Sequence, residues 1–211
     1  MYPVSAGRAQ AGFSMLEAMV AVAVMGIMVA VGVPRMNDWV QASKAGAAAE
    51  FYAEGIKLAR AQAVGNNSSS RFLLIENPAN GQMDWQVDIC FPTPALPCSD
   101  ESGVWSSTAT VAGGDPDGAG GFKSVWRSGA ALPASTVQAQ SFTPVGATDI
   151  YFTSLGWVNT TIAERVTRIT LAPAPAKAGA FPTSALAISL AGMVTKCDPN
   201  ALAHDSRGCP P

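Results

Sequence analysis

Charged side chains and histidine are scarce in this sequence of 211 residues. Charged residues make up 13% of the chain and apolar residues 48%, and there is a single histidine, His204. So little charge is unusual for a soluble enzyme and is expected if one segment faces lipid. The formal net charge is −2, with no basic surplus. Proteins that bind nucleic acid normally carry a basic surplus or a clustered basic stripe, so the charge balance argues against DNA or RNA as the default partner.

Cysteine is absent from the first 89 residues and then occurs as two close pairs, Cys90 with Cys98 and Cys197 with Cys209. Neither pair has the C-x-x-C spacing, and one histidine leaves too few ligands for a zinc site. We interpret the pairs as two small loops closed by disulfides in an oxidising compartment. The alternative is four free buried thiols. Four cysteines allow three connectivities, so the spacing alone does not prove the pairing.

Patterns for catalysis or metal binding are weak. His204 is followed directly by Asp205 and Ser206, and adjacent residues cannot easily form a nucleophile, base and orienting group. The sequence 115–118, Asp-Pro-Asp-Gly, faintly resembles a calcium loop but lacks the downstream glutamate and the full spacing. No glycine-rich phosphate loop precedes a predicted helix. We therefore expect no enzymatic activity, no cofactor and no metal.

A long apolar run occupies residues 13–33, where the only charge is Glu17. Its length is close to the ~20 residues that a helix needs to cross a bilayer. A secretory signal peptide would have an apolar core of about 7–15 residues followed by a small-residue cleavage site. Here the uncharged stretch is longer, no such site follows, and a helix-compatible pattern continues to about Ala63. The run therefore predicts a membrane helix that stays attached.

Glu17 needs an explanation, because an unpaired carboxylate in hydrocarbon costs at least a few kcal/mol. It could reach the headgroups near the helix end, or it could have a partner. The sequence 12–17, Gly-Phe-Ser-Met-Leu-Glu, resembles the signal of type IV prepilins. In that family a dedicated peptidase cuts after the glycine, phenylalanine becomes the first residue, glutamate is the fifth, and proline is common at the twenty-second. Those positions are Gly12, Phe13, Glu17 and Pro34 here, after a short leader, Met1–Gly12, with one basic residue.

The resemblance implies a processing and assembly mechanism. The peptidase would cleave after Gly12 and methylate the new α-amine of Phe13. That cation would pair with Glu17 of a neighbouring subunit, since opposite charges attract strongly in a low-dielectric bundle while either alone is penalised. The pair would set the axial register between subunits. Pro34 removes a helix hydrogen bond, so a kink is expected there.

Beyond Pro34 the pattern predicts the amphipathic half of the same helix, residues 35–63. Apolar residues at spacings of four and seven form one predicted core stripe: Met36, Val40, Ala47, Phe51 and Leu58. The helix is expected to run from Ser14 to about Ala63 and to stop at 65–67, Gly-Asn-Asn.

After Ser70 the pattern changes to short alternating runs, which predict strands separated by segments rich in proline and glycine. The predicted strands are 71–75, 84–91, 122–126, 149–153, 166–171, 185–190 and 193–196. A long helix followed by an antiparallel sheet is an α+β fold. The predicted organisation is a leader 1–12, a transmembrane and filament-core segment 13–34, the amphipathic segment 35–63, and a β-rich head 64–211.

The head is similar to the FimT/FimU and GspH group of minor pilins and pseudopilins. The similarity lies in 58–63 (LARAQA), 150–156 (IYFTSLG) and 188–197 (ISLAGMVTKC). Some members bind DNA through a Gly-Arg-x-Arg pattern, but this chain has Met193 and Thr195 at the arginine positions. Without those guanidinium groups there is little to neutralise phosphates, so DNA binding is not expected.

The resemblance implies a minor type IV pilin that primes or supports pilus assembly. Its partners would be the prepilin peptidase, other major and minor pilins, and the assembly platform of the inner membrane. The protein would begin as a single-pass inner-membrane protein with a periplasmic head and then join a filament at the cell surface. Two alternatives stay open: a pseudopilin of a type II secretion system, and a filament-displayed pilin that binds DNA or a surface.

Overall fold

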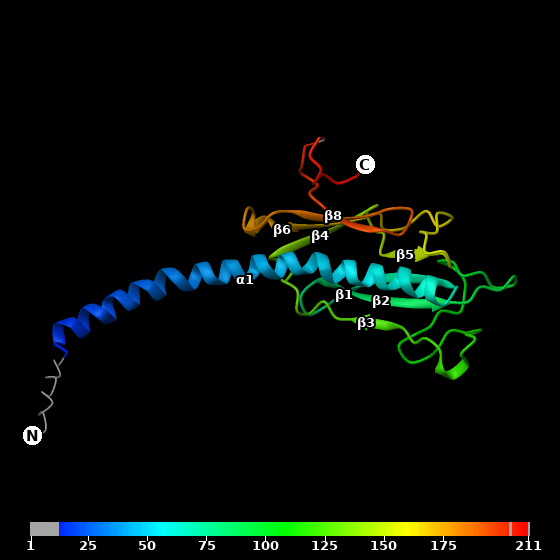
Figure 1. Cartoon of the computed structure of the whole chain (residues 1–211), viewed down its shortest axis with the longest axis horizontal. Helices are drawn as coiled ribbons and strands as arrows, with labels where there is room; N and C mark the ends of the chain where they lie inside the picture. Colours follow the sequence, from blue (N-terminus) through cyan, green and yellow to red (C-terminus); the bar gives the residue numbers. More distant parts are fainter. Residues whose placement is uncertain (1–12, 203, 211) are drawn as a thin grey trace, which may run out of the picture. The chain divides into compact units, whose positions relative to one another are not determined.

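The computed structural model describes residues 13–202 and 204–210, and it has the predicted α+β layout. A 51-residue helix, α1 (Met15–Gly65), precedes eight strands and two 3₁₀ turns within these residues (Figure 1). The chain divides into two compact units: one extends to Val40 and the other is Gln41–Pro211. Helix α1 contributes its first part to one unit and its second part to the other.

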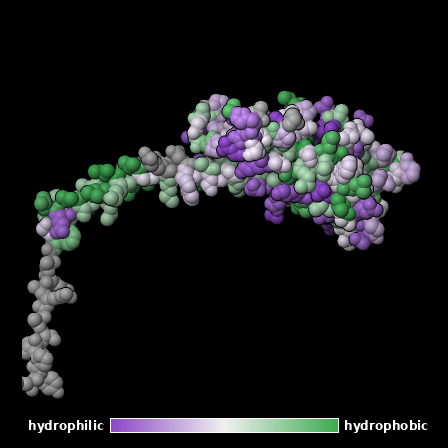
Figure 2. All heavy atoms as spheres, turned by 45° about the horizontal axis from the view of Figure 1, so that its top comes forward, coloured by the Kyte–Doolittle hydropathy of each residue, from purple (hydrophilic) through white to green (hydrophobic). Residues whose placement is uncertain are grey.

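The first part of α1 is apolar, and the other described residues bury none of it. Residues Met15–Val33 have a mean hydropathy of 2.3 and none of them is buried. Figure 2 shows the continuous apolar surface of this segment, with hydrophilic side chains at its start. The segment is long and apolar enough to cross a membrane as a helix.

The end of α1 lies where the sequence predicts it. Asn67 adopts the left-handed conformation, with φ 45°, and the amide of Ser68 donates to the carbonyl of Ala63 at 3.0 Å. Asparagine tolerates this conformation better than most residues. The hydrogen bond from Ser68 satisfies a carbonyl of the last helical turn. Gly65, Asn66 and Asn67 therefore stop the helix, and the chain continues directly into the first strand.

Two antiparallel sheets of four strands complete the head. The first has the order β3-β2-β1-β5 and the second the order β4-β6-β7-β8. In the head, α1 runs between the strands of the two sheets in the view of Figure 1. The strand bounds are β1 Ser69–Asn77, β2 Gln82–Cys90, β3 Val125–Arg127, β4 Gln138–Thr143, β5 Asp149–Phe152, β6 Arg168–Pro173, β7 Ser184–Ile188 and β8 Val194–Cys197.

Strand β4 was not predicted, and β3 is shorter and later than the predicted 122–126. Strand β4 reads Gln-Ala-Gln-Ser-Phe-Thr and lacks the alternation of apolar residues that marks a strand. The inward position that would normally hold an apolar side chain holds Gln138, which is buried. Its amide nitrogen donates to the Ala45 carbonyl of α1 at 3.1 Å. This hydrogen bond fixes the start of the strand against the helix, and Phe142 near its other end packs against the apolar core.

The predicted core stripe on α1 was wrong in its position around the helix. Met36 and Ala47 are exposed, and Phe51 and Leu58 are only partly buried. The face that packs into the head is built mainly from small residues: Ala45, Ala48, Ala49, Tyr52, Ala53, Gly55, Ile56, Ala59 and Ala63. Small side chains let the helix backbone approach the sheets closely.

Large residues of the sheets fill the space that the small helix residues leave. A Cβ on Gly55 would lie 2.7 Å from the Trp85 ring and closer still to Phe72, so no other residue fits without displacing them. Trp85, Phe72 and Ile169 are fully buried and belong to one apolar core with the helix face. Residues of both sheets therefore share a single core around α1.

A buried polar cluster ties the helix to both sheets. The hydroxyl of Tyr52 on α1 donates to the carbonyl of Met83 on β2 at 3.0 Å and accepts from the Gln140 amide on β4 at 2.5 Å. The Gln82 amide on β2 donates to the Gln138 carbonyl on β4 at 2.8 Å. Burial is the main reason that the pKa of Tyr52 is raised to about 12.

Tyr52 makes the head less stable at high pH. Below pH 10 the Tyr52 hydroxyl is protonated in both the folded and the unfolded protein. Between pH 10 and 12 it ionises only in the unfolded protein, because its pKa is raised to about 12 in the folded one. The free energy of unfolding therefore falls by up to about 1.4 kcal/mol per pH unit in this range. Tyr52→Phe should lower stability at neutral pH by about 1–3 kcal/mol, because it removes a buried hydrogen-bonding group. The free energy of unfolding of the variant should also fall less steeply than that of the wild type between pH 10 and 12.

Urea unfolding of the fragment 41–211 measures both effects. The pKa of Tyr151 is also raised to about 12, but Tyr151 is present in both proteins, so the difference between the two slopes isolates Tyr52. Identical slopes for the variant and the wild type would contradict the assignment.

Candidate functional sites

The predicted processing segment lies at the start of α1. Gly12 and the leader lie outside the described residues, and Phe13 is 75% exposed just before the helix. The Ser14 hydroxyl accepts from the Glu17 amide at 3.2 Å, and the Ser14 carbonyl accepts from the Ala18 amide at 3.1 Å. Ser14 therefore caps the helix. The Ser-x-x-Glu spacing of a capping box was present in the sequence but was not used in the prediction.

Glu17 is exposed in the single chain. The described residues form two ion pairs, Arg71–Asp88 and Arg207–Asp205, and neither involves Glu17. Before cleavage the nitrogen of Phe13 is a peptide nitrogen without charge, so only processing can create an N-terminal cation beside this glutamate. Helix α1 continues through Pro34, whose side chain lies outside those described. The kink at Pro34 and the charge pair of Glu17 therefore stay predictions.

The three segments that carry the resemblance in the head meet at Arg60, a residue for which the sequence suggested no role. The Nε of Arg60 donates to the carbonyl of Gly156 and to that of Ala191, both at 3.2 Å. Gly156 belongs to the turn after β5, and Ala191 to the turn between β7 and β8. We call this arrangement the Arg60 clamp, since one side chain of α1 holds two turns that are distant in sequence.

Glycine is required in both clamped turns. Gly156 and Gly192 have φ values of 75° and 73°, a conformation that other residues rarely adopt. A Cβ on Gly192 would also collide with the Gly156 carbonyl oxygen, and one on Gly156 would lie 2.7 Å from a methyl group of Val64. The two turns and the last turns of α1 are therefore closely packed.

Exposed apolar side chains project from the clamped turns. Leu155, Trp157 and Leu190 are 72%, 60% and 60% exposed, and we call these three residues the turn patch. They line a groove of about 540 Å³ together with Thr153, Ser154 and residues 158–161. The Val158 amide donates to the Leu190 carbonyl at 2.9 Å and links the two turns beneath the groove.

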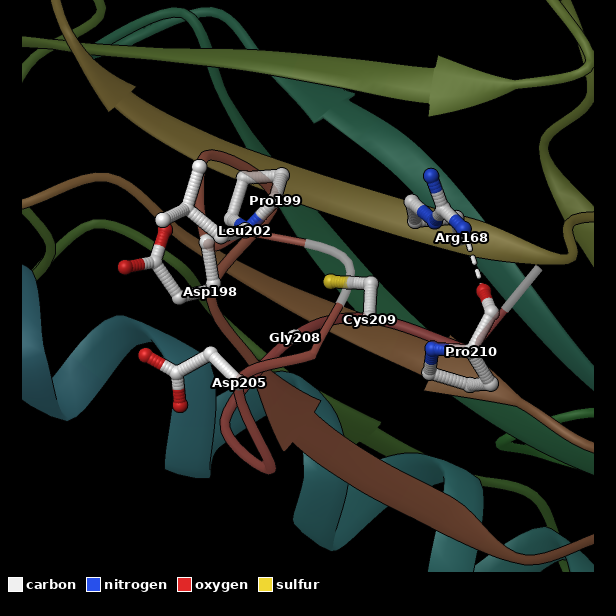
Figure 3. A pocket seen from close by; sticks show the side chains of 9 residues that line it. Arg168, Asp198, Pro199, Leu202, Asp205, Gly208, Cys209 and Pro210 are labelled. Atoms are coloured by element: carbon white, nitrogen blue, oxygen red, sulfur yellow. Dashed lines mark hydrogen bonds between the residues drawn. The ribbon is translucent and has the colours of Figure 1, made fainter.

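Both cysteine pairs are disulfides in the structure, with Cα atoms 6.0 Å apart for Cys90–Cys98 and 4.8 Å apart for Cys197–Cys209. The second disulfide closes a C-terminal loop beside a hollow of about 330 Å³ (Figure 3). Arg168 of β6 donates to the Pro210 carbonyl at 2.8 Å, which fastens the chain after the loop to the second sheet.

An ion pair joins two ionisable groups of the C-terminal loop. Arg207 and Asp205 form an exposed ion pair of 2.7 Å, which lowers the pKa of the aspartate and raises that of the arginine. His204 is exposed beside them. Within residues 13–202 and 204–210, no three His, Cys, Asp or Glu side chains are grouped to hold a metal. The one arginine of the loop is therefore held by a carboxylate of the same loop.

The segment that faintly resembles a calcium loop uses its first carboxylate internally. Asp115 accepts from the amide of Asp117 at 2.9 Å and from the amide of Phe122 at 3.0 Å. Each oxygen of Asp115 therefore has a backbone partner, and this aspartate shapes the loop.

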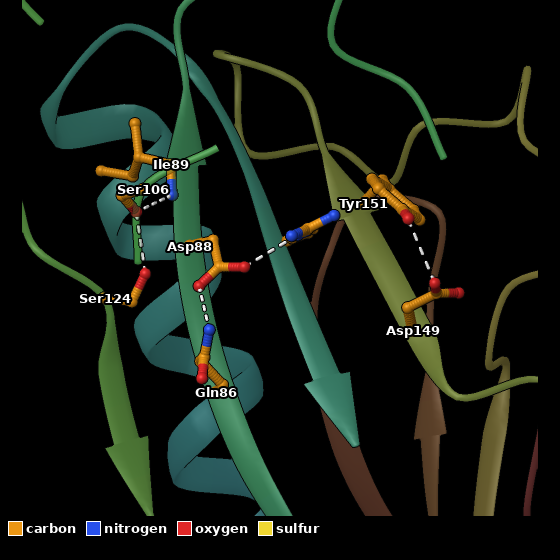
Figure 4. A network of polar contacts seen from close by, with 8 residues as sticks. Gln86, Asp88, Ile89, Ser106, Ser124, Asp149 and Tyr151 are labelled. Atoms are coloured by element: carbon orange, nitrogen blue, oxygen red, sulfur yellow. Dashed lines mark hydrogen bonds and ion pairs between the residues drawn. The ribbon is translucent and has the colours of Figure 1, made fainter. Parts of the chain in front are cut away.

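The outer face of the first sheet carries a polar network (Figure 4). Arg71 of β1 pairs with the buried Asp88 of β2 at 2.8 Å, and its guanidinium lies 4.4 Å from the ring centre of Trp105. Tyr151 of β5 donates to Asp149 at 3.1 Å, and burial raises the pKa of Asp149. The network attaches the segment that follows the Cys90–Cys98 loop to the sheet, so we assign it a structural role.

The comparison with protein families identifies the prokaryotic N-terminal methylation motif at residues 7–33. The matched residues include the Gly12–Phe13 junction, Glu17 and the apolar first part of α1. The chain therefore carries a type IV pilin-like prepilin signal, which implies processing by prepilin peptidase and assembly with other pilins. No curated protein and no solved structure shows significant similarity to the chain.

The Arg60 clamp predicts different costs for two glycine substitutions. Gly192→Ala places a methyl group against the Gly156 carbonyl, whereas Gly146→Ala, at φ 90°, meets no atom within 4 Å. Both substitutions should lower the free energy of unfolding by about 1–2 kcal/mol, because alanine is strained in the left-handed conformation. Gly192→Ala should cost more, because the clamped turns must also separate. Thermal and urea unfolding of the two variants measure the difference; equal costs would show that the turns are not held together.

Proposed function

We propose that this protein is a minor type IV pilin, processed by prepilin peptidase and incorporated into a pilus whose assembly it primes or supports. The observation that carries the proposal is the methylation motif at residues 7–33, in register with an apolar helical segment that is not buried by the described part of the chain. The disulfide-stapled β-rich head on the same helix supports it, because an extracytoplasmic filament subunit folds in an oxidising compartment.

The proposed mechanism begins in the inner membrane, with α1 spanning the bilayer once and the head in the periplasm. Cleavage after Gly12 exposes the amine of Phe13, which is then methylated and stays cationic. That cation pairs with Glu17 of an adjacent subunit in the helix bundle, where neither charge would be stable alone. The assembly platform of the inner membrane and the other pilins are the proposed partners.

Two positions near the C-terminus favour the structural role over DNA binding. Met193 and Thr195, both exposed, occupy the positions where DNA-binding members of the group have arginines. Arg207, a nearby cation, is paired with Asp205. A pseudopilin of a type II secretion system would share the same helix chemistry and differ in its partners.

Intact mass measurement tests the proposal directly. The protein would be recovered from membranes and from sheared surface filaments, in cells with and without prepilin peptidase. A methylated N-terminus at Phe13, present in the sheared fraction only when the peptidase is present, is the expected result. Retention of residues 1–12, or a cut near the end of the apolar run, would overturn the proposed function.

Two substitutions distinguish the role of the Glu17 charge in assembly from the role of its side chain in capping the helix. Glu17→Gln keeps a side chain that suits the third position of a capping box, whereas Glu17→Ala does not. If the charge sets the register, both variants should insert in the membrane normally and should enter filaments roughly tenfold less, the equivalent of about 1.4 kcal/mol. Ser14→Ala is the matched control, since it weakens the cap by about 0.5–2 kcal/mol and leaves the charge.

The readout is the ratio of sheared to membrane-bound protein. Normal incorporation of Glu17→Gln, with loss in Ser14→Ala and Glu17→Ala, would assign Glu17 to helix capping and remove the charge pair from the mechanism.

A further inference from the structure

The backbone that carries the turn patch is held in a fixed conformation. Leu155 and Leu190 lie in separate turns, and Arg60 holds both turns through the carbonyls of Gly156 and Ala191. Because Gly156 and Gly192 leave no room for a side chain between the turns, the exposed leucines are displayed on fixed backbone. A preorganised surface binds a partner with less loss of conformational entropy.

The composition of the patch indicates a protein partner. Trp157 is 60% exposed between two exposed leucines, and a large exposed tryptophan is a common centre of protein interfaces. Residues 153–161 of the groove lining contain no charged residue. The cost of exposing these apolar side chains to water is removed when a partner covers them.

The positive charge of Arg60, beside the patch, indicates that the partner segment carries a negative charge. Arg60 uses its Nε for both carbonyls, and neither ion pair formed by the described residues involves it. Its terminal nitrogens therefore have no carboxylate partner among those residues. A partner segment that combines apolar side chains with a carboxylate complements this surface in both respects.

The patch lies far from the point where the chain enters the head. The head unit begins at Gln41, whereas the patch adjoins the last turns of α1, which ends at Gly65. The methylation motif implies assembly with other pilins, so a second pilin is the protein that an exposed surface of this head would meet under the proposed function.

We propose that the turn patch docks another subunit of the same filament, a chain that itself carries an N-terminal methylation motif, through an apolar segment containing a carboxylate that reaches Arg60. The proposal rests on the proposed function, because it requires assembly into a filament. It adds a residue-level contact that positions this subunit beside its neighbour.

Site-specific photo-crosslinking in cells tests the contact. A photoreactive amino acid at Leu155 of the full chain should form a crosslink to a second chain, which mass spectrometry should identify as carrying the methylation motif. The same probe at Val145, which is 96% exposed in the turn between β4 and β5, is the matched control and should not. A crosslink to a chain without the motif, no crosslink, or equal crosslinking at both positions would overturn the proposal.

A substitution pair provides an independent measurement. Trp157→Ala should reduce the protein in sheared filaments roughly 30-fold, the equivalent of about 2 kcal/mol. Trp126→Ala, at a 47% exposed tryptophan of β3, should change it by no more than about twofold. Mature mass and membrane level should be unchanged in both variants, and thermal unfolding should show that both heads are folded.

The outcomes distinguish the two proposals. If the wild-type chain is unprocessed or absent from filaments, the proposed function fails, and this contact fails with it. If the wild type is processed and incorporated but Trp157→Ala enters filaments as well as Trp126→Ala, only the turn patch is overturned.

Discussion

The apolar first half of α1 is not buried among the described residues, and the change of composition along the helix follows from that constraint. Apolar residues 15–33 are wholly uncovered, so they require either lipid or the helices of other subunits. A helix cannot satisfy this requirement alone and also hold a folded head unless its second half has a different surface. Helix α1 meets both demands by changing composition along its length, from large apolar residues to a face of small ones.

The second half of α1 is held by close approach and by polar contacts. Alanines and Gly55 let the backbone lie against the rings of Phe72 and Trp85. On the same face, Tyr52 and the buried glutamines supply directional hydrogen bonds to both sheets. Because a buried polar group without a partner is costly, these bonds restrict the helix to one rotation and one axial position against the sheets.

Features that depend on local chemistry were predictable from the sequence. The apolar run, the helix stop at residues 65–67 and most of the strands each leave a pattern within a few residues, and the structure confirms the α+β layout. The rotation of α1 was not predictable from large apolar residues, because Phe51 and Leu58 lie at the flank of a face made of alanine. Strand β4 was missed because Gln138 occupies an inward position that an apolar residue normally fills. Arg60 showed no local signal, since its partners, Gly156 and Ala191, are distant in sequence and contribute only backbone carbonyls.

The bond from Gln138 to the Ala45 carbonyl also ties the entry of the chain to the second sheet. The head unit begins at Gln41, and Ala45 is the first buried residue of α1 that follows. Tyr52 lies about two turns further along and bonds to Met83 of the first sheet and Gln140 of the second. Withdrawing the helix from the head would therefore break hydrogen bonds to both sheets together with the apolar contacts around Trp85, so the same contacts hold the helix and join the two sheets.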